Sequence, residues 1–285
     1  MIRVISLFII SFSLTACYEP TEGCLDRRAT NFDISADEPC PDCCTYPTLK
    51  IRFDNKWQYP DTLLAFRTDT VFYDVLNQPF RINRIRFYWS NFKLLLDNGG
   101  ELSITDLIDI KIPDGTDTMT LNVIDHFLLA DINSSTNNLT LGTIVPEGVM
   151  TGFKTDFGIA DPVNKAFISE IPEGHVLSPQ LGNLNYDTDL GYVFAQIEYF
   201  QDTTAADTIP VIINIFGADA LKPLSFDLPT PVMLTEGFNP QLVIETNFAH
   251  WFEGVNVRLG DTTTIQAQIS NNIEGSFVLK EVLSK

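Results

Sequence analysis

From Thr48 onward, apolar and polar side chains alternate along the chain with a period of two. Leu49, Ile51 and Phe53 are apolar, and the residues between them are charged. Because successive side chains of a β-strand point to opposite faces, this pattern indicates strands with one buried and one solvated face. Further segments rich in aromatic and β-branched residues, which favour strands, are 82–89, 92–96, 139–145, 192–200, 209–216, 241–248 and 276–282.

Turn-forming residues separate these segments. Asn98-Gly99-Gly100 lies between two apolar runs and predicts a hairpin, and Asp114-Gly115 and Pro146-Glu147-Gly148 are similar breakers. We expect only short helices, at 161–167, where Asp161 can cap the first turn, and near 249–252. The sequence therefore predicts an all-β fold, a single antiparallel β-sandwich over residues 48–285.

The N-terminus carries the features of a bacterial lipoprotein signal peptide. Arg3 precedes an apolar run that ends in Leu14-Thr15-Ala16-Cys17, and the run is too short to span a bilayer. We expect residues 1–16 to be removed and Cys17 to be lipidated. The alternative is an ordinary secretory signal followed by an incidental cysteine. Either way the chain belongs in the cell envelope, and with the lipid we expect it at the outer membrane, facing the periplasm or exposed at the surface.

All five cysteines lie in the first 44 residues, which makes residues 17–47 a separate lipid-anchored, cysteine-rich segment. With Cys17 acylated, four thiols remain and allow three pairings. We favour Cys24 with Cys44 and Cys40 with Cys43. A bond between the adjacent Cys43 and Cys44 would strain their peptide, and closing a loop of roughly 20 residues supplies about 3 kcal/mol. A four-thiolate zinc site and a thioredoxin-type motif are the alternatives.

The mature chain is strongly acidic. Loss of Arg3 leaves 17 basic and 37 acidic residues, a formal charge of about -20. Such a charge disfavours binding to nucleic acid, so nucleic-acid functions are excluded. Apolar residues make up 45% of the sequence, enough for a packed core. No later segment is apolar for long enough to form a second membrane span.

Two parts of the sequence resemble known families. The first includes Gly23-Cys24-Leu25-Asp26, residues 29–33 and Cys44-Thr45-Tyr46. It is similar to a short cysteine motif, GC-D-A-N-Y-D-A-C-Y, near the start of some bacterial envelope lipoproteins.

The second resemblance covers most of residues 48–285. The segments 86–94, 145–148, 152–159 and 191–194 occur in an order and spacing that resemble the MbnP-like family of copper-binding proteins, and Phe216-Gly217 and residues 248–252 also fall in matching places. The resemblance implies a non-catalytic β-sandwich that holds copper with histidines and an oxidised tryptophan, and that works beside a di-haem peroxidase.

The residues at the family's copper positions differ in this chain. Where the family has Trp-x-Trp or Trp-x-His before a Gly-Tyr pair, this sequence has Tyr186-Asp187-Thr188 before Gly191-Tyr192. The second histidine of the family would precede a glycine on the following strand, and residues 214–217 contain none. Copper favours imidazole and sulfur ligands, so a site without them selects a harder ion such as calcium, or no ion.

The candidate metal ligands are therefore His175, Tyr186, Asp187 and Asp189. His175 falls in a loop near the expected site, and two carboxylates two residues apart on a turn can share a hard cation. Asp-Thr-Asp is equally typical of a solvated turn. Of the two other histidines, His250 lies beside Trp251 and Phe252, where we expect packing or a polar contact, and His126 follows Asp125 in a mixed segment and is a weaker candidate than His175.

No catalytic motif is evident. The sequence has no G-x-S-x-G, no H-E-x-x-H and no glycine-rich phosphate loop, and we expect no enzymatic activity. Trp57, Trp89 and Trp251 are assigned to the core, although aromatic side chains can also form a carbohydrate platform. A surface adhesion or glycan-binding module is therefore the alternative to a protein that binds a metal or a partner.

Overall fold

The computed structural model describes residues 19–180, 185–201, 203 and 209–285. The predicted signal peptide and the predicted lipid attachment at Cys17 lie outside these residues. Within the described part of the chain, no helix is both long enough and apolar enough to cross a membrane.

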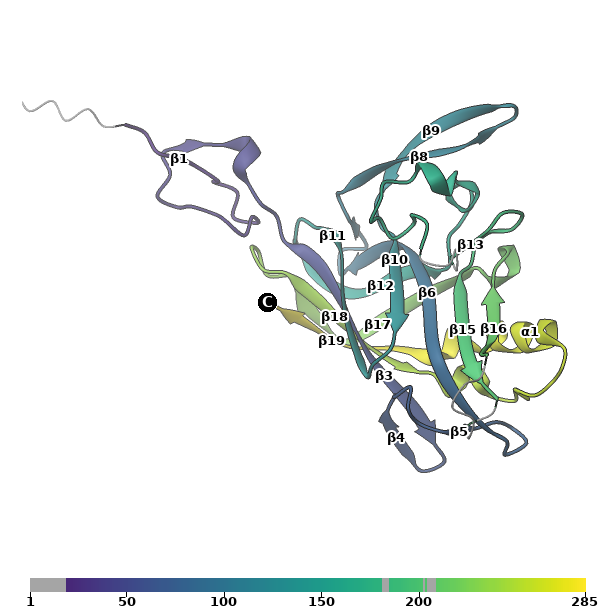
Figure 1. The fold of residues 1–285 in the computed structure, drawn as a ribbon. Coiled ribbons are helices and arrows are strands. Elements are labelled where there is room, and N and C mark those ends of the chain that lie inside the picture. The colour runs from purple at the N-terminus through teal and green to yellow at the C-terminus, as the bar shows by residue number, and fades with distance from the viewer. Residues whose placement is uncertain (1–18, 181–184, 202, 204–208) are drawn as a thin grey trace, which may run out of the picture.

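Two β-sheets pack face to face and confirm the predicted β-sandwich (Figure 1). The larger sheet has the strand order β16-β15-β6-β12-β17, and β5, β7 and β10 also pair with β6. Its strands are β5 (Phe72–Tyr73), β6 (Pro79–Leu96), β7 (Glu101–Ser103), β10 (Leu128–Ile132), β12 (Val149–Phe157), β15 (Ala195–Phe200), β16 (Val211–Ile215) and β17 (Lys222–Met233).

The smaller sheet has the order β11-β3-β18-β19, and β4 pairs with β3. Its strands are β3 (Thr48–Tyr59), β4 (Thr62–Ala65), β11 (Thr136–Thr143), β18 (Pro240–Asn247) and β19 (Phe277–Ser284). The pairing within the sandwich is antiparallel except between β3 and β18, which run parallel. A parallel neighbour needs a crossover, and here every strand of the larger sheet lies between the two strands in sequence.

The core between the sheets is built from aromatic rings. Trp89 contacts Phe53 edge-on at 5.0 Å between ring centroids and Phe277 at 4.9 Å. Trp57 and Trp251 are also buried, so all three tryptophans occupy the core, as predicted. Such ring pairs add to the free energy gained by burial.

Strand β6 merges the two predicted strands 82–89 and 92–96 into one. Its central residues 85–90 are all buried, although a strand with one solvated face would alternate. Phe87 and Trp89 face the core, and Arg86, Tyr88 and Ser90 occupy the alternate positions. The connection between β12 and β15 contacts this second face, and the candidate site lies there.

The helical predictions were only partly right. Residues 161–167 and 249–252 form single 3-10 turns, η2 (Val163–Lys165) and η6 (His250–Phe252). The described residues contain one α-helix, α1 (Thr262–Asn272), which we did not predict. Asp261 caps it by accepting from Thr263 N at 3.0 Å, and Ile265 and Ile269 are buried.

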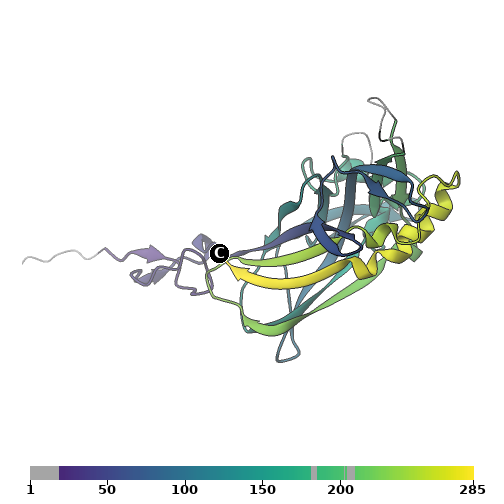
Figure 2. The ribbon, with the colours of Figure 1, turned by 90° about the horizontal axis from the view of Figure 1, so that it is seen from below.

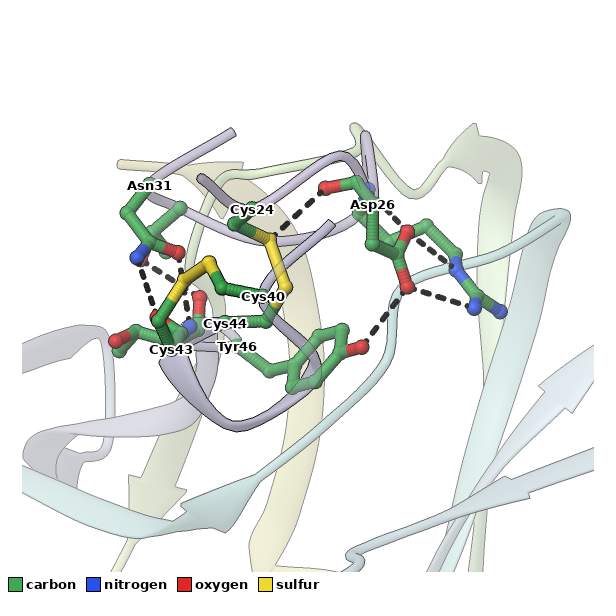
Figure 3. The surroundings of a disulfide bond; sticks show 10 residues. Cys24, Asp26, Asn31, Cys40, Cys43, Cys44 and Tyr46 are labelled. Carbon is green, nitrogen blue, oxygen red and sulfur yellow. Dashed lines mark hydrogen bonds and ion pairs between the residues drawn. A yellow bond between two sulfur atoms is a disulfide. The ribbon is translucent and has the colours of Figure 1, made fainter. Parts of the chain in front are cut away.

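The N-terminal segment forms a small separate unit, held by disulfides Cys24–Cys44 and Cys40–Cys43, the pairing that the sequence favours (Figure 3). It contains β1 (Glu22–Gly23), β2 (Glu38–Pro39) and the turn η1 (Pro41–Cys43). Because all four thiols are oxidised, they do not form the alternative four-thiolate zinc site.

Polar side chains complete this unit. Asp26 accepts from Arg28 Nη2 at 2.8 Å and from the Tyr46 hydroxyl at 2.9 Å, and the bond to Arg28 holds the pKa of Asp26 well below its usual range. Asn31 donates to Cys43 O at 2.7 Å and accepts from Thr45 N at 2.8 Å. Figure 2 shows the unit at one end of the sandwich, with α1 at the opposite end.

Candidate functional site

The connection between β12 and β15 crosses the outer face of the larger sheet and contains all four predicted ligands. It includes η2, η3 (Ile168–Glu170) and the short hairpin of β13 (Tyr186–Asp187) and β14 (Gly191–Tyr192). Both ends of the connection bind the backbone of Tyr88 on β6. Gly158 N donates to Tyr88 O at 2.9 Å, and Tyr88 N donates to Phe194 O at 2.8 Å. This double anchor places the connection over Tyr88.

Two buried tyrosines form the centre of the site. The Tyr88 hydroxyl donates to Val176 O at 2.7 Å, and the Tyr192 hydroxyl donates to Leu177 O at 2.8 Å. Their rings meet edge-on at 5.7 Å. Burial raises the pKa of both phenols, so both are neutral at physiological pH.

Asn185 completes this centre. It donates through Nδ2 to the Tyr88 hydroxyl at 3.0 Å and to Ser178 O at 3.1 Å, and its Oδ1 accepts from Gln180 N at 3.1 Å. A buried polar side chain with all these partners fixes the path of the loop. We refer to Tyr88, Asn185, Tyr186 and Tyr192 as the tyrosine cluster.

Tyr186 joins the cluster from its edge. Its ring meets that of Tyr192 edge-on at 5.1 Å, and its hydroxyl donates to Ala166 O at 3.1 Å. Burial raises the pKa of the Tyr186 phenol. A metal would need the deprotonated oxygen, which this environment disfavours.

Asp187 and Asp189 belong to a turn. Asp187 Oδ1 accepts from Asp189 N at 2.9 Å and from Leu190 N at 3.0 Å, whereas the side chain of Asp189 is exposed. This is the geometry of an Asx turn, the structural alternative that the sequence offered. The two carboxylates do not form a cation site with the other predicted ligands.

Both ring nitrogens of His175 have partners. Leu177 N lies 3.1 Å from Nδ1 and can only donate, so Nδ1 is an acceptor. The proton of the neutral ring is therefore on Nε2, which lies 3.0 Å from Asp125 Oδ1 and donates to it. The imidazole thus links the loop 175–178 to Asp125, and neither of its nitrogens is free to bind a metal in this arrangement.

The other two histidines have different partners. His126 packs edge-on against Phe127 at 5.1 Å, and burial lowers its pKa. His250 is exposed, and its Nδ1 lies 3.4 Å from Glu253 Oε2. Over the described ranges, no three His, Cys, Asp or Glu side chains are grouped so that they could hold a metal ion.

The glycine that precedes Tyr192 in the sequence, Gly191, has a steric reason. Its φ of +86° is in the left-handed region, and an added Cβ would lie 2.4 Å from Asn164 O. Asn164 Oδ1 also accepts from Tyr192 N at 2.9 Å. Only glycine allows this close approach, which sets Tyr192 into the cluster.

Sequence reasoning identified Tyr186 as a site residue but assigned no role to Tyr88, Asn185 or Tyr192. Tyr88 and Tyr192 do fall within the family-like segments 86–94 and 191–194, which was the signal that the sequence contained. No local pattern marks Asn185.

Comparison with known proteins gives one family. The MbnP family model matches residues 46–271. Among solved structures, MbnP from Methylosinus trichosporium is similar, with 12% sequence identity, a TM-score of 0.44, and coverage of 73% of this chain and 79% of that chain. No curated protein sequence matches. Because the family model spans well over half of its length, this chain belongs to the MbnP family.

Proposed function

We propose that this chain is a lipid-anchored, non-catalytic MbnP-family protein of the cell envelope that binds a protein partner and holds no copper at the family's position. The observation that carries the proposal is the bonding of the predicted ligands. Both ring nitrogens of His175, the hydroxyl of Tyr186 and one carboxylate oxygen of Asp187 form hydrogen bonds within the protein.

The donor set does not fit copper. Copper prefers imidazole or sulfur, and the imidazole of His175 has both nitrogens engaged. It does not fit calcium either, because Ca²⁺ takes six to eight oxygens. One oxygen of Asp187 already accepts two backbone amides, and Asp189 is directed into solvent.

Metal analysis tests this part of the proposal. The mature chain is produced in an envelope compartment with copper in the medium, its metal content is measured, and it is titrated with Cu(I), Cu(II) and Ca²⁺. We expect far less than one equivalent of any of them. One equivalent of copper that is lost in His175→Ala would contradict the proposal. His250→Ala is the matched control, since His250 is exposed and outside the cluster.

The family resemblance also supplies the proposed partner, a di-haem peroxidase. If a gene for such an enzyme neighbours the gene for this chain, the two purified proteins should co-elute in size-exclusion chromatography. Separate elution at micromolar concentrations of both would contradict this choice of partner.

A second candidate function, glycan binding, rests on a pocket beside the turn η6. The pocket has a volume of about 350 Å³, and Trp57, Tyr73, Phe252 and Asn247 line it. Tyr73 is 58% exposed, which suits a sugar-stacking platform. Trp57 contributes only an edge, since its ring stacks on Phe72 at 3.9 Å.

A glycan array with the mature chain tests this alternative. Binding that is lost in Tyr73→Ala and kept in Tyr73→Phe would establish it, because the phenylalanine keeps the aromatic face. The absence of binding to every glycan on the array would exclude the sugars tested.

A further inference from the structure

A β-hairpin beside the candidate site has one strand edge that the protein leaves open. Strands β8 (Leu107–Asp114) and β9 (Asp117–Ile124) pair with each other along their whole length and form a separate two-stranded sheet. Figure 1 shows them projecting from the sandwich, with β9 as the outer strand. We did not predict either strand.

The register identifies the backbone groups that point outward. Asp114 and Asp117 flank a turn of Gly115 and Thr116, so they form a hydrogen-bonded pair. Because hydrogen-bonded and non-hydrogen-bonded pairs alternate, the N–H and C=O groups of every second β9 residue point away from β8. These outward-facing residues are Thr118, Thr120 and Asn122.

Two observations on β8 support this assignment. Lys111, opposite Thr120, uses its outward carbonyl to accept from Phe167 N at 2.9 Å. Pro113, opposite Thr118, has no N–H to offer at its outward position. The free edge of β8 is therefore blocked by a proline and covered by the segment that leads into η3.

The edge of β9 has no such protection. Within the described ranges, no backbone hydrogen bond reaches the outward groups of Thr118, Thr120 or Asn122. Strand β9 contains no proline, lysine or bulge, which are the usual features that protect an edge. Each of these three residues offers one N–H and one C=O group, and together the groups can hydrogen-bond an added strand.

The surroundings indicate what such a strand contains. The hairpin carries the carboxylates of Asp109, Asp114 and Asp117, and its one cation, Lys111, is neutralised by Glu170 at 2.9 Å. On the polar face of the hairpin, a hollow of about 490 Å³ is lined by Lys111, Thr118, Thr120, Phe167, Ser169 and Glu170. A basic side chain from the added strand can enter this hollow.

The opposite face of the hairpin is apolar. Met119 is 41% exposed and lies on the same face as the buried Ile112 with which it pairs. An added strand would place every second side chain beside this face. A partner strand that fits both faces of the hairpin therefore alternates apolar residues with lysine or arginine.

We infer that the outer edge of β9 binds an extended, basic segment of a partner protein by antiparallel strand addition. A second copy of this chain is a poor occupant, because the formal charge is -19 and pairing β9 with itself would bring the hairpin carboxylates together. The inference rests on the proposed partner-binding function and names the surface that performs it.

A designed peptide tests the inference directly. The probe is a fluorescent eight-residue peptide of alternating lysine and valine, and the control is the same peptide with every backbone amide N-methylated, which keeps the charge and removes the donors. We expect the first peptide to bind the mature chain, the control not to bind, and the amides of Thr118, Thr120 and Asn122 to gain protection from hydrogen exchange in the complex.

The protein variants are Thr120→Pro, which removes an outward N–H without removing a bond to β8, and Thr120→Val, which keeps the N–H. We expect Thr120→Pro to weaken binding about tenfold or more, and Thr120→Val to bind like the unchanged chain. Thr118→Pro repeats the test at the next outward position, and circular dichroism checks that each variant is folded.

Several results would overturn the inference. They are equal binding of both peptides, equal binding by the folded proline variants and the unchanged chain, or no binding of the first peptide. A dimer of the unchanged chain that Thr120→Pro dissociates would make a second copy the occupant. None of these results affects metal content or co-elution with the peroxidase, so failure here is distinguishable from failure of the proposed function.

Discussion

Tyr88 illustrates how one residue can determine the character of a site. Its backbone binds both ends of the connection over the sheet, and its hydroxyl donates to Val176 O and accepts from Asn185. A buried polar group is costly unless it is hydrogen-bonded, and each of these groups has a partner. The tyrosine cluster is therefore a closed, bonded structure rather than a set of free ligands.

Replacing Tyr88 by phenylalanine should destabilise the fold by about 2 kcal/mol, because Val176 O loses its donor and Asn185 loses an acceptor in a buried place. Urea unfolding measures the change in the free energy of unfolding. Tyr73→Phe is the control, since its hydroxyl is exposed and has no hydrogen bond within the described residues, and we expect a change near zero. Equal stabilities of the two variants would contradict the bonding described here.

Alkaline titration tests whether the tyrosine side chains are buried. Burial raises the pKa of Tyr199 to about 12, and it raises the pKa of Tyr88 and of Tyr192 far above the ordinary value. Because the folded-state pKa values lie above the unfolded value of about 10, this contribution to stability is complete below pH 10 and is lost as the pH rises through the folded-state values. The phenolate absorbance of the folded protein should therefore show these tyrosines ionising only at higher pH or on unfolding. Titration of all eight tyrosines near pH 10 in a folded protein would contradict it.

At the scale of elements, the sequence predicted strands β18 and β19 close to their observed bounds, and the start of β3 at Thr48. Regular alternation was not sufficient for a prediction, since β8 alternates at Ile108, Ile110 and Ile112 and was still missed. Strand β17 was missed because Pro223, Pro229 and Pro231 interrupt it, and it lies at the edge of its sheet, where proline is tolerated. A local pattern does not show which strand will be an edge.

Helix α1 was missed for a different reason, which lies in its composition. Its threonines and asparagines have low helix propensity, so the two buried isoleucines and the cap determine it. Asp261→Ala should cost about 1 kcal/mol in the free energy of unfolding, and Asp261→Asn should cost much less, because asparagine also caps. Thermal unfolding of both variants measures this. An alanine variant as stable as the asparagine variant would contradict the role of the cap.

The candidate site was less predictable than the fold, because hydrogen bonds between segments distant in sequence determine it. His175 and Tyr186 could be proposed from their place in the family-like order, and both lie in the region expected. Their hydrogen bonds to Asp125 and Ala166 depend on segments 50 and 20 residues away in sequence. Such tertiary partners decide whether a side chain is free to bind a ligand, and no local spacing reveals them.

At the scale of the whole molecule, the disulfide-linked unit and helix α1 lie at opposite ends of the sandwich (Figure 2). The unit contacts the body through Arg27 and Glu236 at 3.7 Å and through Arg28 and Glu147 at 3.9 Å, and Gly237 lies close to Ala29 O. A lipid on Cys17 would then hold the molecule by this end and direct the α1 end away from the membrane.

The proposed anchor is tested by replacing one sulfur. Cys17→Ser should move the chain from the membrane fraction to the soluble envelope fraction, whereas Cys24→Ser should leave it with the membrane, since Cys24 serves a disulfide. Fractionation followed by mass spectrometry of the N-terminal peptide measures both effects. A Cys17→Ser chain that stays in the membrane fraction would contradict lipid anchoring.

The proposal that this chain holds no copper rests on the hydrogen bonds of His175, Tyr186 and Asp187 within the protein. The most direct test is a crystal of the mature chain soaked in a copper salt and measured at the copper absorption edge, where an anomalous difference map locates each bound ion. We expect no copper peak within bonding distance of His175, Tyr186 or Asp187. A strong peak that joins any two of these side chains would contradict it.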